Sequence, residues 1–186
     1  MQYFNKGHRG IIYTDLNRKI IVKISDKKRI LNEVKWLKKL NRYKIGPKLI
    51  IYNSNYLILR HIKGKKILDY LKESNKKQIL PVIKEILLQC RILDKLKINK
   101  LEMHHPVKHI IINRKVNLID FERAYKTKNT KNLTQFCQFL LSKKVQDLLM
   151  QKNIFLDKNK FILILKKYKK KQNESNFLEL SRIFND

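Results

Sequence analysis

Apolar and polar residues alternate in short runs through the first third of the chain, and this alternation predicts strands separated by turns. After the third predicted strand, apolar residues recur at helical spacing, and Ser25-Asp26 can cap the helix that they predict. The expected strands lie on both sides of a glycine turn in residues 3–13, and then at 19–24, 49–52 and 56–61. Five strands with one inserted helix would make a small antiparallel β lobe.

The rest of the chain is dominated by helical spacing of its apolar residues. The most regular pattern follows Ser74-Asn75 and predicts a central helix with one apolar stripe: Ile79, Ile83, Ile86, Cys90 and Leu93. Further helices are expected at 67–72, 133–141, 144–150, 161–168 and 177–183, and two short strands at 110–112 and 116–119. The predicted fold class is α+β, with a β-rich domain at 1–61 and a helical domain at 62–186 that contains a polar loop, 101–123.

The charge balance indicates polyanionic partners. The 186 residues include 44 lysines and arginines against 15 acidic residues, which gives a net charge of +29. A coding bias toward lysine explains part of this excess but not the scarcity of acids. Charge of this size opposes compaction and favours nucleic acid as a partner. Because few aromatic residues could serve as stacking platforms, structured RNA or duplex is favoured over single strands.

The sequence favours a soluble, cytoplasmic protein that does not enter a membrane. No apolar run approaches the roughly 20 residues that span a bilayer, and residues 1–6 lack the apolar region of a secretory signal. Cys90 and Cys137 both fall within helical patterns, so we expect reduced cysteines in the core rather than a disulfide or a metal site.

One carboxylate stands directly after an apolar strand near the middle of the chain. Val116, Leu118 and Ile119 would bury this strand. Asp120 would emerge at its end, and Phe121 would pack into the core. Kinase-type phosphotransferases hold Mg²⁺ against the phosphates of ATP in this way, so Asp120 is a candidate metal ligand.

Two charged residues, Lys23 and Glu33, interrupt apolar patterns of the β lobe. In so basic a chain a strand lysine is usually only solvated, and Glu33 can form a surface ion pair with Arg29 one helical turn earlier. The functional alternative is that Glu33 pairs with Lys23. The sequence alone leaves both interpretations open.

The chemically densest segment is 101–109, which holds three of the five histidines beside Glu102 and Lys108. A zinc site is one interpretation of such a cluster. It is disfavoured because no cysteine lies nearby and the His-Glu-x-x-His pattern of zinc proteases is absent.

Taken in order, these features resemble the protein-kinase-like fold: a glycine turn, a strand lysine, a helix glutamate, a hinge, a central helix, a polar loop and Ile-Asp-Phe. More narrowly, residues 105–111 (HPVKHII) and 118–124 (LIDFERA) are similar to motifs of the small archaeal RNA kinase family, related to the RIO-type and tRNA-modification-complex kinases. The resemblance covers about residues 5–141. It implies a minimal two-lobed kinase-like fold that transfers phosphate from ATP to a ribose 2′-hydroxyl in the variable region of tRNA.

The resemblance also implies roles for individual residues. Lys23 would hold the α- and β-phosphates of ATP and would itself be held by Glu33, and Asp120 would bind Mg²⁺. The full set expected to bind or border the nucleotide is Gly7, Gly10, Lys23, Glu33, Arg60 and Ile62.

The polar loop departs from the ordinary kinase pattern, which is His-x-Asp followed five residues later by a metal-binding Asn. Counting back from Asp120 puts His109 at the Asn position and His104 at the Asp position, whereas counting forward from the central helix puts Glu102 there. The general base therefore stays open between Glu102 and His104. Lys108 either offsets charge on the transferring phosphoryl group or contacts the RNA backbone.

Glu122 stands where ordinary kinases carry the glycine of Asp-Phe-Gly. It would be either a second metal ligand or an ion-pair partner of Arg123. The favoured function is an ATP- and Mg²⁺-dependent tRNA kinase acting as a monomer. The alternatives are a RIO-type protein serine/threonine kinase and, because His-x-Asp is absent, a catalytically inactive kinase fold that binds RNA.

Overall fold

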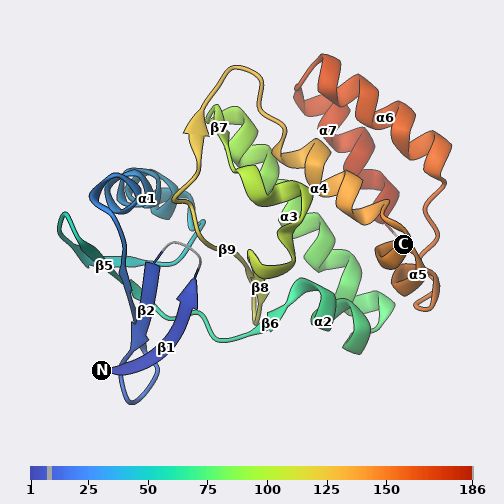
Figure 1. Cartoon of the computed structure of the whole chain (residues 1–186). Helices are drawn as coiled ribbons and strands as arrows, with labels where there is room; N and C mark the ends of the chain where they lie inside the picture. Colours follow the sequence, from blue (N-terminus) through green and yellow to red (C-terminus); the bar gives the residue numbers. More distant parts are fainter. Residues whose placement is uncertain (8–9, 186) are drawn as a thin grey trace. The chain divides into compact units, whose positions relative to one another are not determined.

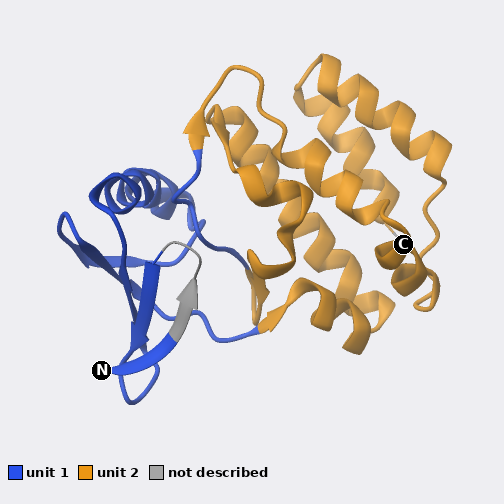
Figure 2. Ribbon diagram, viewed as in Figure 1, with its two compact units in different colours: residues 1–64, 117–124 blue, residues 65–116, 125–186 orange. Residues whose placement is uncertain are grey.

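The computed structural model describes residues 1–7 and 10–185, and the chain divides into two compact units (Figure 2). Unit 1 comprises Met1–Gly64 and Asn117–Ala124, and unit 2 comprises Lys65–Val116 and Tyr125–Asp186. The sequence assigns residues 117–124 to the helical domain, whereas in the structure they pack with the β-rich unit. Asp120 therefore belongs to the same unit as Lys23 and Glu33.

Unit 1 is built on a five-stranded antiparallel sheet in the order β1-β2-β3-β5-β4 (Figure 1). The five predicted strands are confirmed, and the last of them ends one residue earlier than expected. Their bounds are β1 (Gln2–Gly7), β2 (Gly10–Thr14), β3 (Ile20–Ile24), β4 (Leu49–Tyr52) and β5 (Tyr56–Arg60).

Helix α1 (Lys27–Leu40) follows β3 and packs against β4 and β5. It begins after Asp26, whose side chain accepts a hydrogen bond from the backbone N–H of Arg29 at 3.1 Å. Of the apolar positions that predict the helix, Leu31 is exposed and the other four are buried: Ile30, Val34, Leu37 and Leu40. Each such side chain contributes about 1.5–3 kcal/mol through burial. Because Glu33 lies on the same face of α1, it is carried into the interior of the unit.

Unit 2 is organised around the long helix α3 (Lys76–Lys95), which begins with a reciprocal capping box between Asn75 and Gln78. Every residue of its predicted stripe is fully buried, and Cys90 and Cys137 are buried free thiols as expected. The mixed α+β class is confirmed. The other helices are α2 (Ile67–Glu73), α4 (Asn132–Leu140), α5 (Lys143–Met150), α6 (Lys158–Lys170) and α7 (Glu174–Ser181).

Short strands connect the helices of unit 2. Strand β6 (Lys65–Lys66) pairs with β8 (Ile110–Ile112), and β7 (Ile98–Asn99) pairs with β10 (Tyr125–Lys126). The unit boundary falls inside β9 (Val116–Leu118), which ends just before the Asp120 segment. Two 3₁₀ turns, Leu101–His104 and Pro106–Lys108, form the first part of the polar loop.

Helix α6 is longer than its apolar pattern predicts, 158–170 instead of 161–168. It starts early because the Asp157 side chain accepts hydrogen bonds from the backbone N–H groups of Asn159 and Lys160, both at 3.0 Å. Lysines extend its last turn, where they complement the negative end of the helix dipole. Across residues 1–7 and 10–185, none of the helices is long and apolar enough to cross a membrane.

Candidate functional site

An ion cluster in unit 1 joins the consecutive elements β3 and α1 to the Asp120 segment, which is far from both in the sequence. The Lys23 ammonium nitrogen, on β3, lies 2.8 Å from a carboxylate oxygen of Glu33 on α1 and 2.8 Å from one of Asp120. A carboxylate oxygen of Glu122 lies 3.0 Å from the same nitrogen. The structure therefore brings together Lys23, Glu33 and Asp120, and it adds Glu122 to them.

This geometry decides between the two partners that the sequence leaves open for Glu33. Glu33 is almost completely buried and pairs with Lys23, so a surface pair with Arg29 is wrong; Arg29 pairs with Asp26 at 3.2 Å. Glu122 reaches Lys23, a partner that neither alternative for that residue named.

Glu33 also holds the backbone that carries Asp120. One of its oxygens binds Lys23, and the other accepts a hydrogen bond from the backbone N–H of Phe121 at 3.1 Å. The Phe121 ring is fully buried, as predicted, and packs close to Gly46, where a Cβ would lie only 3.2 Å from the ring. Phe121, the next residue in the chain, therefore holds the backbone at Asp120 in place through both its N–H and its buried ring.

Two residues of α1, Asn32 and Trp36, anchor the same segment further along. The Asn32 side-chain amide donates to the backbone carbonyl oxygens of Glu122 at 2.8 Å and Ala124 at 3.0 Å. The indole N–H of Trp36 donates to the Ala124 oxygen at 2.8 Å. Sequence reasoning missed both residues. Two features of the sequence could have identified them. Asn32 is a polar amide next to Glu33, and Trp36 is the chain's one tryptophan and lies among the buried residues of α1.

Asp120 has an unusual backbone conformation, with φ of 65° in the left-handed region. Non-glycine residues adopt this conformation seldom, aspartate and asparagine more readily than most, and it concentrates at functional sites. The Asp120 side chain is also the most exposed carboxylate of the cluster, at 35% against 2% for Glu33 and 8% for Glu122. Asp120 is therefore the carboxylate most accessible to an incoming ligand.

The charges of the cluster depend on one another. Burial by itself lowers the pKa of the Lys23 amine, but the carboxylates of Glu33, Asp120 and Glu122 outweigh burial and raise this pKa above its usual value. Burial raises the pKa of the Glu33 carboxyl, and Lys23 opposes that shift. Lys23 therefore stays charged at neutral pH.

The cluster has the donor set of a divalent cation site. Glu33, Asp120 and Glu122 each offer an oxygen, and these atoms lie within 4.8 Å of one another. When all three are ionised they exceed the single ammonium by two negative charges, which is the charge balanced by one Mg²⁺. Mg²⁺ prefers oxygen ligands and usually completes its shell with water and substrate phosphates. These residues therefore fit the metal that the sequence predicts.

Replacing Trp36 by phenylalanine should test the anchoring of this segment. The ring would remain in the core, but the hydrogen bond to Ala124 would be lost. Because Asn32 still donates to the same oxygen, we expect a loss of about 1 kcal/mol in the free energy of unfolding. Urea unfolding followed by circular dichroism would measure it, with exposed Lys39→Gln as a control. An unchanged stability would show that the indole N–H does not anchor the segment.

The other residues that were predicted to bind or border a nucleotide also lie in unit 1. Gly7 pairs with Gly10 at the ends of β1 and β2, and residues 8–9, where the predicted glycine turn falls, lie outside the described part of the chain. A Cβ on Gly10 would lie 2.4 Å from the Ile24 carbonyl oxygen, so close strand packing alone requires glycine there. Arg60 ends β5 with an exposed side chain, and Ile62 is half-buried shortly before the unit boundary.

The predicted residues of the polar loop belong to unit 2. Glu102 lies 2.9 Å from the ammonium of Lys100, whose side chain is fully buried. His104 is exposed, and its Nδ1 lies 2.9 Å from the Leu101 carbonyl oxygen. The other two predicted residues of the loop are Lys108, which is exposed, and His109, which is half-buried. Sequence reasoning missed Lys100, because nothing in a lysine-rich chain distinguishes one buried lysine from the solvated ones.

A scan against protein-family models finds no match to this chain. The chain is similar to a protein of the archaeon Methanocaldococcus jannaschii that is called uncharacterized protein MJ1211. The two are 32% identical over 118 residues, which is 60% of this chain and 99% of the M. jannaschii protein.

Proposed function

We propose that this chain, which belongs to the same family as the M. jannaschii protein MJ1211, is an ATP-dependent kinase that phosphorylates a ribose 2′-hydroxyl of tRNA. The observation that carries the proposal is the ion cluster of Lys23, Glu33 and Asp120, because the kinase-like resemblance requires these three residues to meet. The basic surface, with its net charge of +29, independently favours an RNA substrate.

Each residue of the cluster would have a separate task. The Lys23 ammonium would bind the α- and β-phosphates of ATP, and Glu33 would hold it in place. Asp120, the most exposed carboxylate, would bind Mg²⁺ together with Glu122. When bound, the metal neutralises charge on the phosphates, and alignment with charge neutralisation supplies most of the catalysis in phosphoryl transfer.

Of the two candidate bases, the contacts favour His104. A carbonyl oxygen can only accept a hydrogen bond, so the contact with Leu101 requires the proton on Nδ1 of His104. In the neutral ring this leaves Nε2 free of a proton and able to accept one from the ribose hydroxyl. Glu102, in contrast, is the counter-charge of a fully buried ammonium. In the reaction the 2′-oxygen would bond to the γ-phosphorus, ADP would leave, and the hydroxyl proton would pass to His104.

Substitutions at the two positions should therefore behave differently. We expect Glu102→Ala to cost about 3 kcal/mol of stability, because it removes a carboxylate 2.9 Å from a buried ammonium. We expect His104→Ala to keep stability and to lower the transfer rate by about 10²- to 10⁴-fold, the range of general base catalysis. Urea unfolding and single-turnover kinetics would measure the two effects. A stable but inactive Glu102→Gln variant alongside an active His104→Ala variant would reverse the assignment.

The central experiment follows the label of γ-³²P-ATP into RNA. Incubation with unfractionated tRNA and Mg²⁺ should label tRNA, and nuclease digestion should release the label as a 2′-phosphonucleotide. Label on protein and none on RNA would instead indicate the RIO-type protein kinase. ATP binding without transfer to any substrate would indicate a catalytically inactive RNA-binding module.

A further inference from the structure

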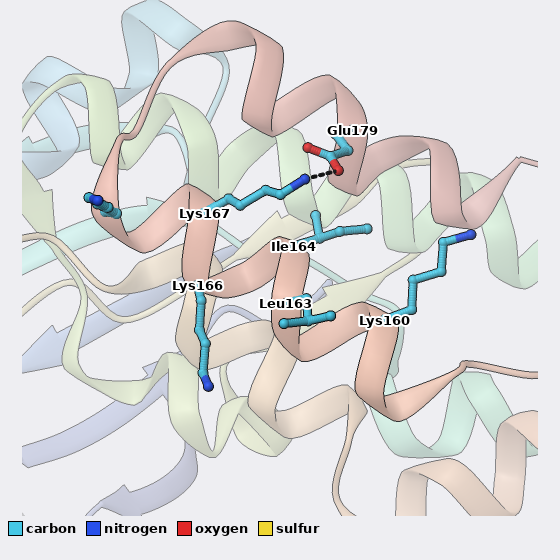
Figure 3. Close-up of a pocket in the computed structure, with 7 residues that line it drawn as sticks. Lys160, Leu163, Ile164, Lys166, Lys167 and Glu179 are labelled. Atoms are coloured by element: carbon cyan, nitrogen blue, oxygen red, sulfur yellow. Dashed lines mark hydrogen bonds and ion pairs between the residues drawn. The ribbon is translucent and has the colours of Figure 1, made fainter.

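A strongly basic exposed surface with a hollow in it lies on helix α6 of unit 2. The helix carries six lysines and no acidic residue. Four of these lysines line a hollow of about 480 Å³ together with Leu163, Ile164 and one acid, Glu179 of α7: they are Lys160, Lys166, Lys167 and Lys170. Figure 3 shows Lys167 extending across to Glu179, with Leu163 and Ile164 between Lys160 and Lys167 along the helix.

The charge around this hollow is not balanced by the protein. The single acid is already paired, because Glu179 lies 2.8 Å from Lys167. Within the part of the chain that the structure describes, Lys160, Lys166 and Lys170 are exposed and take part in no ion pair. Three uncompensated ammonium groups around one depression form a site that fits an anionic partner.

The spacing of these lysines fits a polymer of phosphates. Lys160 and Lys170 are ten residues apart on one helix, a rise of about 15 Å. One strand of a duplex carries about four phosphates over that distance along its axis. A row of lysines of this length therefore matches several successive phosphates of a nucleic acid backbone better than one small anion.

An anionic membrane surface fits α6 less well. A helix that lies in a membrane surface needs a broad exposed apolar face. The apolar residues of α6 that form its main stripe are buried in unit 2: Phe161, Ile164, Leu165 and Tyr168. Only Leu163, at 60% exposure, is a largely exposed apolar residue of this helix.

We propose that the α6 face formed by Lys160, Lys166 and Lys170 is an RNA-docking surface that binds the phosphate backbone of the substrate. The proposal rests on RNA being the substrate, as proposed above, but not on catalysis. The surface would hold the RNA without reading its sequence, and selectivity would come from the shape of the RNA and from the site of chemistry.

The same helix provides a matched control. Lys158 and Lys169 are exposed on α6 but do not line the hollow. Lys158 and Lys160 both lie in the first turn, and Lys169 and Lys170 both lie in the last. The double variants Lys160→Gln/Lys170→Gln and Lys158→Gln/Lys169→Gln therefore change net charge and the helix dipole equally.

The test measures binding of unfractionated tRNA to the full chain over a range of salt concentrations. For Lys160→Gln/Lys170→Gln we expect roughly a tenfold or larger rise in Kd at moderate salt. The slope of log K against log salt should become shallower by about 1.4 to 1.8, from 0.7 to 0.9 per lost phosphate contact. The control variant should change Kd less than threefold. Circular dichroism melting of both variants would show that the fold is kept.

Other results would overturn the inference in recognisable ways. Equal losses in the two double variants would mean that net charge, rather than this face, binds RNA. Normal tRNA binding by Lys160→Gln/Lys170→Gln, with weaker binding to phosphatidylglycerol vesicles, would assign the face to a membrane. Failure of label transfer with the binding result intact would refute the proposed kinase while leaving the docking surface in place.

Discussion

Replacing Asp120 by asparagine should lower phosphate transfer to tRNA by about 10³-fold while leaving the fold intact. The substitution removes the charge of the most exposed carboxylate in the cluster but keeps an oxygen 2.8 Å from Lys23. Asparagine is the suitable replacement because it tolerates the left-handed conformation of this position, with φ of 65°, better than alanine does. Single-turnover transfer from labelled ATP at saturating tRNA would measure the effect.

Two controls accompany the Asp120 variant. Its tRNA affinity should equal that of the unchanged protein, because the docking surface proposed on α6 is untouched. Trp36 donates to Ala124, four residues from Asp120, so the fluorescence of this one tryptophan should respond to Mg²⁺-ATP in the unchanged protein and respond less in the variant. An Asp120→Asn protein that transfers phosphate at the normal rate would remove Asp120 from the metal site and the kinase proposal with it.

Replacing Lys23 by methionine should have the largest effect on stability, about 3–5 kcal/mol. The change leaves three neighbouring carboxylates without their common ammonium, and two of them, Glu33 and Glu122, are mostly buried. Urea unfolding at neutral pH would measure the loss. Lys28→Met, at an exposed position of the same unit, is the control, and surface changes of this kind usually stay within about 0.5 kcal/mol.

The stability of the Lys23 variant should depend on pH and on Mg²⁺. Burial already raises the pKa of Glu33, and without Lys23 only the hydrogen bond from the backbone N–H of Phe121 opposes that shift. A group with a raised folded-state pKa stabilises the fold below its unfolded pKa and loses that contribution as pH rises, so the deficit should shrink toward acid pH. Mg²⁺ should also stabilise the variant if the carboxylates bind the ion. A deficit that is independent of both would argue against a shared carboxylate site.

The elements of this fold are local properties of the sequence. The strands of unit 1 follow from alternation, α1 follows from its apolar stripe and the Asp26 cap, and α3 follows from its stripe and the Asn75 cap. Each of these signals is contained within a few neighbouring residues. Helix α6 was predicted too short. The residues left out of the prediction are mostly polar ones at its two ends, where a cap and favourable contacts with the helix dipole extend the helix, and the spacing of apolar residues does not indicate such extensions.

The candidate site was predictable only in part. Asp120 could be identified because a strand end exposes a carboxylate, and Lys23 and Glu33 because they interrupt apolar patterns. The sequence did not show that Glu122 joins them or that Asn32 and Trp36 of α1 hold the segment after Asp120. Those contacts depend on how α1 packs, and spacing along the chain does not contain that information. The proposed preference for His104 over Glu102 likewise rests in part on Lys100, whose burial was not visible in a chain with 44 basic residues.

By itself the sequence determined the main strands and helices, the α+β class, the strong positive charge and the position of one carboxylate after a strand. Only the tertiary structure decided that Asp120 packs with the β-rich unit and meets Lys23 across 97 residues of chain. The physical reason is that periodicity and capping are set by neighbours in sequence. An ion cluster, in contrast, depends on which buried surfaces pack together, because that packing brings charged residues from distant segments close to one another. In this chain that packing, through Glu33 and Phe121, turns separate charged residues into a single site.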